Sequence, residues 1–299
     1  MTRYEKLMER IHAGERILID GGTGTEIERR GVPQLDNAWN GGGALSHPDI
    51  VRAVHEDYLD LGAEIVIANN FATNYYALRD AGEADRFEAY NRRGVELAIE
   101  ARENLEKPEA LVAAGISHWS FSGNHPSLED FKTAAEQQVA ILADAGAEII
   151  LLEMMIDIDR MLILLDAAVA VGLPVWVGFS CEINEQGVPR LQQEGVLLSV
   201  ALDAIKDRPV DLINIMHTEV VDIHACLDVL QANWDGPVGV YAHTGEFVIE
   251  DQSWIFTDTI SPADYAAAAE QWIGRGVNVI GGCCGIEPRH IEQLAKVVR

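Results

Sequence analysis

The sequence is poor in basic residues and in cysteine. Its 299 residues include 22 Lys and Arg against 48 Asp and Glu, which gives a formal net charge of −26. This excess of negative charge argues against nucleic acid or an anionic membrane surface as a partner. Four cysteines, two of them adjacent, do not suggest a disulfide framework and indicate thiols kept in a reducing compartment.

Long apolar runs are also absent. No run approaches the length of a membrane span, and the first residues carry charges of both signs, unlike a secretion signal. We therefore expect a cytoplasmic protein without a membrane partner. No segment rich in Pro, Ser or charge divides the chain, so we expect one domain, residues 1–299; pairing with a second copy stays open.

What the sequence does contain is a series of apolar, strand-like runs. Most are continuously apolar, as strands of a parallel sheet covered on both faces should be, and helical patterns separate them. The runs are 17–20, 64–69, 111–116, 148–153, 174–180, 211–216, 238–243 and 277–282. Eight strand–helix units predict an α/β fold, a (β/α)8 or TIM barrel, with an open doubly wound sheet as the alternative.

The last of these runs leads into Gly281-Gly282-Cys283-Cys284-Gly285. Thiolates are soft ligands suited to zinc, and adjacent residues in a turn can both ligate one ion. An ordinary disulfide between the two cysteines is disfavoured, because neighbouring Cα atoms lie closer than the usual bridge geometry. The alternative is that both side chains pack as small apolar residues.

Polar residues stand at the carboxyl ends of the other runs, where a barrel carries its chemistry. Asp20 either caps the following helix or binds substrate. Glu153 ends an apolar strand, where a carboxylate needs a partner, so it predicts a cationic ligand group. His217 and His243 are either functional or structural loop residues.

Four stretches together resemble the homocysteine S-methyltransferase family. They are D-G-G-T-G-T-E-I-E-R-R-G from Asp20, A-N-N-F-A-T-N from Ala68, L-L-E-M-M from Leu151 and the closing G-G-C-C-G. The resemblance implies a (β/α)8 barrel with Zn²⁺ as cofactor, held in part by Cys283 and Cys284. Zinc would keep the sulfur of homocysteine as a thiolate, which would take a methyl group and become methionine.

The resemblance also implies partners and roles. The partners would be a small-molecule thiol and a methyl donor, here a small onium compound of the S-methylmethionine, betaine or dimethylsulfoniopropionate type. The catalytic residues would be Cys283, Cys284 and Glu153, with Glu153 holding the ammonium group of homocysteine. The implied substrate-binding residues are Asp20, Gly21, Gly22, Thr23, Glu26, Asn69, Phe71, Glu153 and His243.

The chain departs from the family's pattern at three strand ends. Asn214-Ile215 lacks the cysteine that follows the asparagine of the sixth strand, and this removes the third thiolate. Ala242-His243 replaces a common Pro-Asn pair, and Ser117-His118 replaces a frequent Gly-Pro.

We expect His217 to complete a metal site with the paired cysteines, since imidazole is a normal zinc ligand. Cys181 and His243 are the alternatives, and Met216 is nearer to the missing cysteine but a weak ligand.

Two other functions stay as alternatives: the same barrel with a changed donor or acceptor thiol, or a non-catalytic metal- or amino-acid-binding protein.

Overall fold

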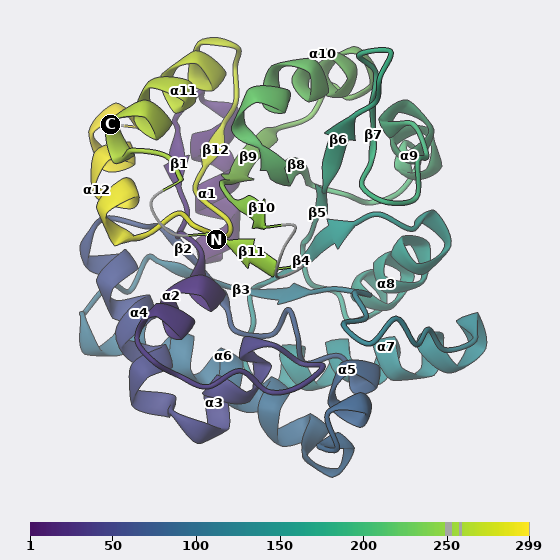
Figure 1. Cartoon of the computed structure of the whole chain (residues 1–299). Helices are drawn as coiled ribbons and strands as arrows, with labels where there is room; N and C mark the ends of the chain where they lie inside the picture. Colours follow the sequence, from purple (N-terminus) through teal and green to yellow (C-terminus); the bar gives the residue numbers. More distant parts are fainter. Residues whose placement is uncertain (249–252, 257–258, 299) are drawn as a thin grey trace.

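Eight parallel strands form one sheet in the order β1-β12-β9-β8-β5-β4-β3-β2. The structure is a computed structural model that describes residues 1–248, 253–256 and 259–298. A parallel bridge between Ile19 and Ile65 joins the first strand to the second and closes the sheet. The helices surround this closed sheet (Figure 1), so the predicted (β/α)8 barrel is confirmed and the open doubly wound alternative is wrong.

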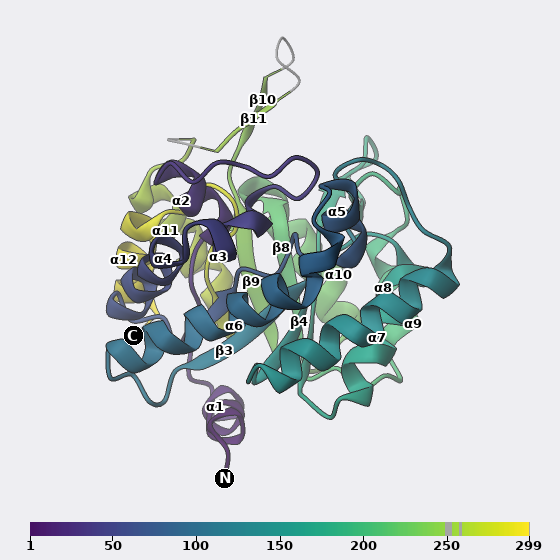
Figure 2. The same ribbon diagram turned by 90° about the horizontal axis from the view of Figure 1, so that it is seen from below.

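The barrel strands occupy the eight predicted runs. They are β1 (Ile17–Leu18), β2 (Ile65–Ala68), β3 (Leu111–Ile116), β4 (Ile149–Met155), β5 (Val175–Phe179), β8 (Leu212–Glu219), β9 (Val238–His243) and β12 (Val279–Ile280). Two antiparallel pairs lie outside the barrel: β6 (Cys181–Ile183) with β7 (Pro189–Leu191), and β10 (Glu246–Val248) with β11 (Ser253–Ile255). Figure 2 shows β10 and β11 projecting beyond the barrel.

Several helices begin with a side-chain cap or a first-turn proline. Ser127 accepts the backbone N–H of Asp130, Ser261 accepts that of Asp264, and Pro48 lies in a first turn. The helices are α1 (Arg3–His12), α2 (Thr23–Arg29), α3 (Gly43–Ser46), α4 (Pro48–Asp60), α5 (Tyr75–Asp80), α6 (Phe87–Asn104), α7 (Leu128–Asp144), α8 (Ile158–Ala170), α9 (Leu198–Ile205), α10 (Ile223–Asn233), α11 (Pro262–Gly274) and α12 (Pro288–Val297). Short 3₁₀ turns are η1 (Asn40–Gly42), η2 (Ala84–Arg86) and η3 (Val220–Asp222). Within the described ranges, no helix is both long and apolar enough to cross a bilayer.

Helix α1 closes the amino-terminal end of the barrel, opposite to β10 and β11 (Figure 2). Its Leu7 and Ile11 are buried. The hydroxyl of Tyr4 accepts from the indole N–H of Trp176 at 3.1 Å and donates to Asp211 at 2.9 Å. Access to the barrel interior therefore lies at the other end, where the strands finish.

Candidate metal and substrate site

A cavity of about 500 Å³ opens at the carboxyl ends of the strands. Most of the predicted site residues line it: Gly21, Gly22, Thr23, Asn69, Phe71, Glu153, His217, His243, Cys283 and Cys284. Of the described residues that line the cavity, none is Asp20 or Glu26, although both were predicted to bind substrate. The closed barrel thus gathers side chains that lie far apart in the sequence.

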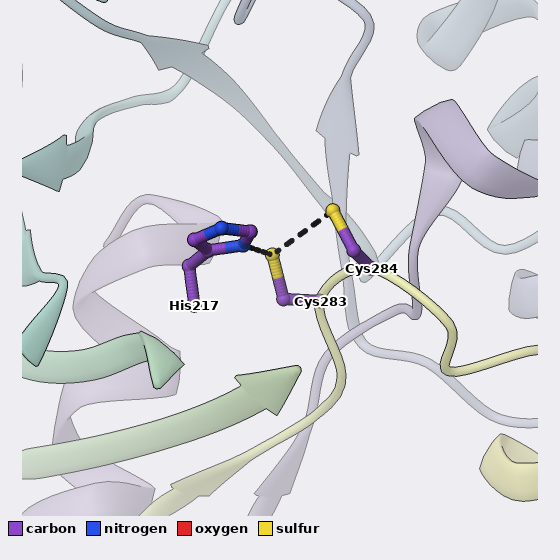
Figure 3. A group of neighbouring side chains, drawn as sticks. All are labelled: His217, Cys283 and Cys284. Carbon is purple, nitrogen blue, oxygen red and sulfur yellow. Dashed lines mark hydrogen bonds between the residues drawn. The ribbon is translucent and has the colours of Figure 1, made fainter. Parts of the chain in front are cut away.

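The paired cysteines meet His217 at this mouth (Figure 3). The two sulfurs lie 3.9 Å apart, and the sulfur of Cys283 lies 3.6 Å from Nδ1 of His217. The three ligand atoms all fall within 4.8 Å of one another, and among the described residues they form one group of metal-ligating type.

Local backbone geometry creates this meeting. The pairing of β8 with β9 shifts register between Met216 and Glu219, and His217 adopts φ +42°, which is uncommon for a residue with a side chain. On the other side, a Cβ on Gly22 would lie 2.6 Å from the carbonyl oxygen of Cys283. Only glycine lets the turn after β1 approach the cysteine turn so closely.

The two separations from the sulfur of Cys283 match those in a tetrahedral zinc site. Zn–S bonds of about 2.3 Å and Zn–N bonds of about 2.0 Å at tetrahedral angles place two sulfurs about 3.8 Å apart and a sulfur and a nitrogen about 3.5 Å apart. The observed separations, 3.9 Å and 3.6 Å, are close to these values. Two sulfurs and one imidazole also leave a fourth position for a substrate atom, as catalytic zinc sites do.

The two thiols are electrostatically unequal. The S–H of Cys283 donates to the sulfur of Cys284, which lowers the pKa of Cys284 and raises that of Cys283. His217 and His243 lower the pKa of Cys284 further. One thiolate is therefore favoured even before a ligand binds.

The alternatives for the third ligand have other partners. Cys181 is buried, and its thiol makes a hydrogen bond to Cys226 of α10. His243 stands edge-on to His217, with ring centroids 4.2 Å apart, and its Nε2 lies 2.9 Å from Glu219. The sulfur of Met216 accepts the backbone N–H of Met154 at 3.1 Å. Neither Cys181 nor His243 belongs to the group of three.

Glu153 lies at the barrel mouth beside the hydroxyl of Tyr241. Burial raises its pKa to about 8; the nearby hydroxyl of Tyr241 opposes this rise, and the charge of Cys284 adds to it. Tyr241 itself is buried without a well-formed hydrogen bond from its hydroxyl. Its pKa is raised well above the usual range, again mainly by burial. A cationic group entering the mouth would stabilise the ionised form of Glu153.

The prediction that Asp20 caps the helix after β1 is wrong. The N-cap of α2 is Gly22, and no side chain caps it. One oxygen of Asp20 accepts the backbone N–H of Ile67 at 2.7 Å, and the other has no hydrogen-bond partner among the described residues. Burial raises its pKa, and the charge of Glu153 adds to the effect.

Two further candidates have partners within the protein. Glu26 is buried and accepts from the guanidinium groups of Arg29 and Arg30 at 2.6–2.8 Å, so its carboxylate is neutralised away from the cavity. The amide of Asn69 donates to the carbonyl of Asn40 at 2.9 Å. Asn69 still lines the cavity, beside the turn that carries Trp39.

An aromatic wall, most of which the sequence did not predict, lines one side of the cavity. Trp39, Phe71, Trp119 and Phe121 line the cavity, and their neighbouring ring centroids lie 6.3–6.5 Å apart. They come from three separate loops, and only Phe71 is among the predicted substrate-binding residues. The one available signal was that aromatic residues follow the strand ends, as at Trp119 after β3.

A closed parallel barrel with two thiols, an imidazole and buried carboxylates at its mouth has the architecture of a barrel enzyme with its active site at the carboxyl ends of the strands. The model of the homocysteine S-methyltransferase family matches residues 17–298. The chain therefore belongs to this family of methyltransferases.

Individual relatives agree with this assignment. Homocysteine S-methyltransferase 2 of Zea mays is 27% identical and covers 96% of this chain and 91% of its own length. Selenocysteine Se-methyltransferase of Brassica oleracea var. italica is also 27% identical, with 95% and 89% covered. The fold matches that of the metallated homocysteine methyltransferase MmuM from Escherichia coli, with a TM-score of 0.80, 24% identity and 99% of each chain covered.

Proposed function

We propose that this protein transfers a methyl group from a small onium donor to the thiol of homocysteine, giving methionine. Residues 1–299 would act as one domain, with zinc held by Cys283, Cys284 and His217. The observation that carries the proposal is the juxtaposition of these three residues with Glu153 in one cavity. When bound, zinc would lower the pKa of the acceptor thiol and hold it as a thiolate near neutral pH.

The acceptor would be held by its amino group. Glu153 is buried, has no cationic side-chain partner among the described residues, and feels the charge of Cys284. An ammonium group at Glu153 would compensate its desolvation and leave the acceptor sulfur directed toward the paired cysteines. Asp20 is buried close enough to Glu153 for the charge of Glu153 to raise its pKa. Its second carboxylate oxygen, which has no hydrogen-bond partner among the described residues, is available to the acceptor.

Charge supports a cationic donor. Among the described residues, the cavity is lined by the carboxylates Glu153, Glu182, Glu219 and Asp222 and by no Lys or Arg. Glu182 forms an ion pair at 2.8 Å with Arg190, which does not line the cavity. The pKa of Asp222 is raised by burial and by the charges of Glu219 and Glu182. A positively charged donor is attracted to such a cavity, and an anionic methylated folate is repelled.

The aromatic wall supports the same class of donor. Faces of tryptophan and phenylalanine attract sulfonium and quaternary ammonium groups through their ring quadrupoles. The wall formed by Trp39, Phe71, Trp119 and Phe121 lies across the same cavity as the thiols. It would orient the onium methyl group toward the acceptor and exclude water.

The transfer itself would be an in-line displacement. A lone pair of the acceptor sulfur forms the new S–C bond while the bond from the methyl carbon to the donor sulfur or nitrogen breaks. The donor leaves as a neutral thioether or tertiary amine, and the thiol proton is lost beforehand to solvent. Because the leaving product is no longer cationic, its attraction to the aromatic wall falls and release becomes easier.

The test is turnover of the zinc-loaded protein with homocysteine and S-methylmethionine, betaine or dimethylsulfoniopropionate, followed as methionine formed. We expect at least one onium donor to support turnover and methylated folate to support none. Turnover with the folate alone would contradict the assignment of the donor. Ligand-induced thermal stabilisation without turnover would favour a non-catalytic binding protein.

One observation favours testing a second acceptor. A 27% identical relative is named for methylation of selenocysteine. A selenol is more acidic than a thiol, so we would include selenocysteine in the same assay. A higher kcat/KM for selenocysteine than for homocysteine would reassign the acceptor without changing the site.

A further inference from the structure

Glu153 reaches the cavity from an irregular part of β4. The register between β4 and β5 shifts between Leu152 and Met155, so the strand bulges at Glu153 and Met154. A bulge re-aims side chains. Met154 also adopts φ +55°, which is rare for a residue with a side chain. Such a conformation persists only where neighbouring groups hold it.

The turn after Glu153 is held from two sides. Nε2 of His118 accepts the backbone N–H groups of Ile156 and Asp157, both at 3.4 Å. The sulfur of Met216 accepts the backbone N–H of Met154 at 3.1 Å. The backbone N–H groups of Met154, Ile156 and Asp157 thus all have side-chain acceptors, as buried donors outside regular pairing require.

His118 is suited to this role. It is 6% exposed, and burial lowers its pKa to about 4, so the ring is neutral at neutral pH. The two N–H groups that face Nε2 select the tautomer with its proton on Nδ1, which leaves Nε2 free to accept. His118 follows β3, whose Gly115 provides the space for the carboxylate. A Cβ on Gly115 would lie 2.1 Å from Oε2 of Glu153. The end of β3 therefore supplies both room and support for Glu153.

We propose that His118 is a positioning residue for the acceptor: by holding the N–H groups of Ile156 and Asp157, it fixes the turn that aims Glu153 at the acceptor's ammonium group. This inference rests on the proposed function, because it takes the contact between Glu153 and the amino group as given. It adds a role for a histidine at one of the three positions where the chain departs from the family's pattern.

The test compares two ligands that differ only in the amino group. Homocysteine and its des-amino analogue 4-mercaptobutyrate are titrated into zinc-loaded protein by calorimetry. His118→Leu removes the acceptor nitrogen, and we expect it to weaken homocysteine binding by about tenfold and 4-mercaptobutyrate by less than about twofold. His118→Gln, whose amide oxygen can accept in place of Nε2, should restore most of the affinity.

A matched control is available in α4. His55 is fully buried, and neither of its ring nitrogens has a hydrogen-bond partner among the described residues. His55→Leu should change stability without changing the ratio of the two affinities. If His118→Leu is insoluble, His118→Asn makes the same comparison, because its shorter side chain does not reach Ile156 and Asp157.

Equal losses for the two ligands, or a His118→Gln variant as weak as His118→Leu, would overturn the role of His118. The variant Glu153→Gln distinguishes a failure of the role of His118 from a failure of the proposed function. If Glu153→Gln weakens homocysteine binding but His118→Leu does not, only the role of His118 is wrong. If Glu153→Gln binds both ligands like the wild type, the contact between Glu153 and the amino group is wrong, and the inference fails with it.

Discussion

The sulfur of Cys283 lies 3.6 Å from Nδ1 of His217, although 66 positions separate the two residues. An imidazole therefore stands beside the paired thiols, where the family resemblance implies a third thiolate. Replacing a thiolate by an imidazole makes the site one unit less negative. The bound acceptor thiolate should then form more readily but attack less strongly.

Changing His217 should change zinc binding. We expect His217→Ala to weaken zinc affinity by more than about 100-fold and His217→Cys to retain zinc, since cysteine is itself a zinc ligand. Competition with a chelator measures the affinity, and a zinc-edge spectrum should show one nitrogen neighbour replaced by sulfur in His217→Cys. Cys181→Ala is the control, because that thiol faces Cys226. Unchanged affinity in His217→Ala would remove His217 from the site.

Stability should depend on pH through Glu153. Burial raises its pKa to about 8, well above the value of about 4.3 in an unfolded chain. Between these two values the native protein binds a proton that the unfolded chain does not, so stability falls as pH rises through this range. Glu153→Gln removes the titration, and its gain in Tm over the wild type should be larger at pH about 9 than at pH about 6. A gain that is equal at both pH values would contradict a neutral, buried Glu153.

The aromatic wall should affect the donor and not the acceptor. We expect Trp39→Leu to raise the KM of the onium donor by about three- to thirtyfold, the range of one desolvated cation–π contact. The KM of homocysteine should stay nearly constant. Trp39→Phe keeps a ring at this position and serves as the matched control. A rise in both KM values would point to general damage of the cavity rather than to a donor contact.

Salt should stabilise the protein. At a net charge of −26, self-repulsion opposes the compact state, and 1 M salt shortens the screening length to about 3 Å. We therefore expect Tm to rise between 0.05 and 1 M KCl, as followed by circular dichroism. Surface ion pairs such as Arg92–Asp144 and Lys132–Glu136 act in the opposite direction, but each contributes little. A fall in Tm would show that these pairs outweigh the net repulsion.

The barrel and the position of its thiols could be predicted from the sequence. Continuously apolar runs alternating with helical patterns are a local property of the chain, and the eight runs coincide with β1 to β5, β8, β9 and β12. In a closed parallel barrel, all strand ends meet at one mouth. Once the runs were recognised, Glu153 and the pair Cys283-Cys284 had to lie at the same mouth.

The tertiary structure alone decided which neighbours these residues have. His217, and not Cys181 or His243, reaches the thiols because a register shift in β8 and a left-handed residue turn its ring inward. The bulge that aims Glu153 and the contacts of His118 with the next turn are likewise long-range. Spacing along the chain indicates which strand end a side chain occupies, but its direction within the mouth depends on bulges and loop packing that no local pattern records.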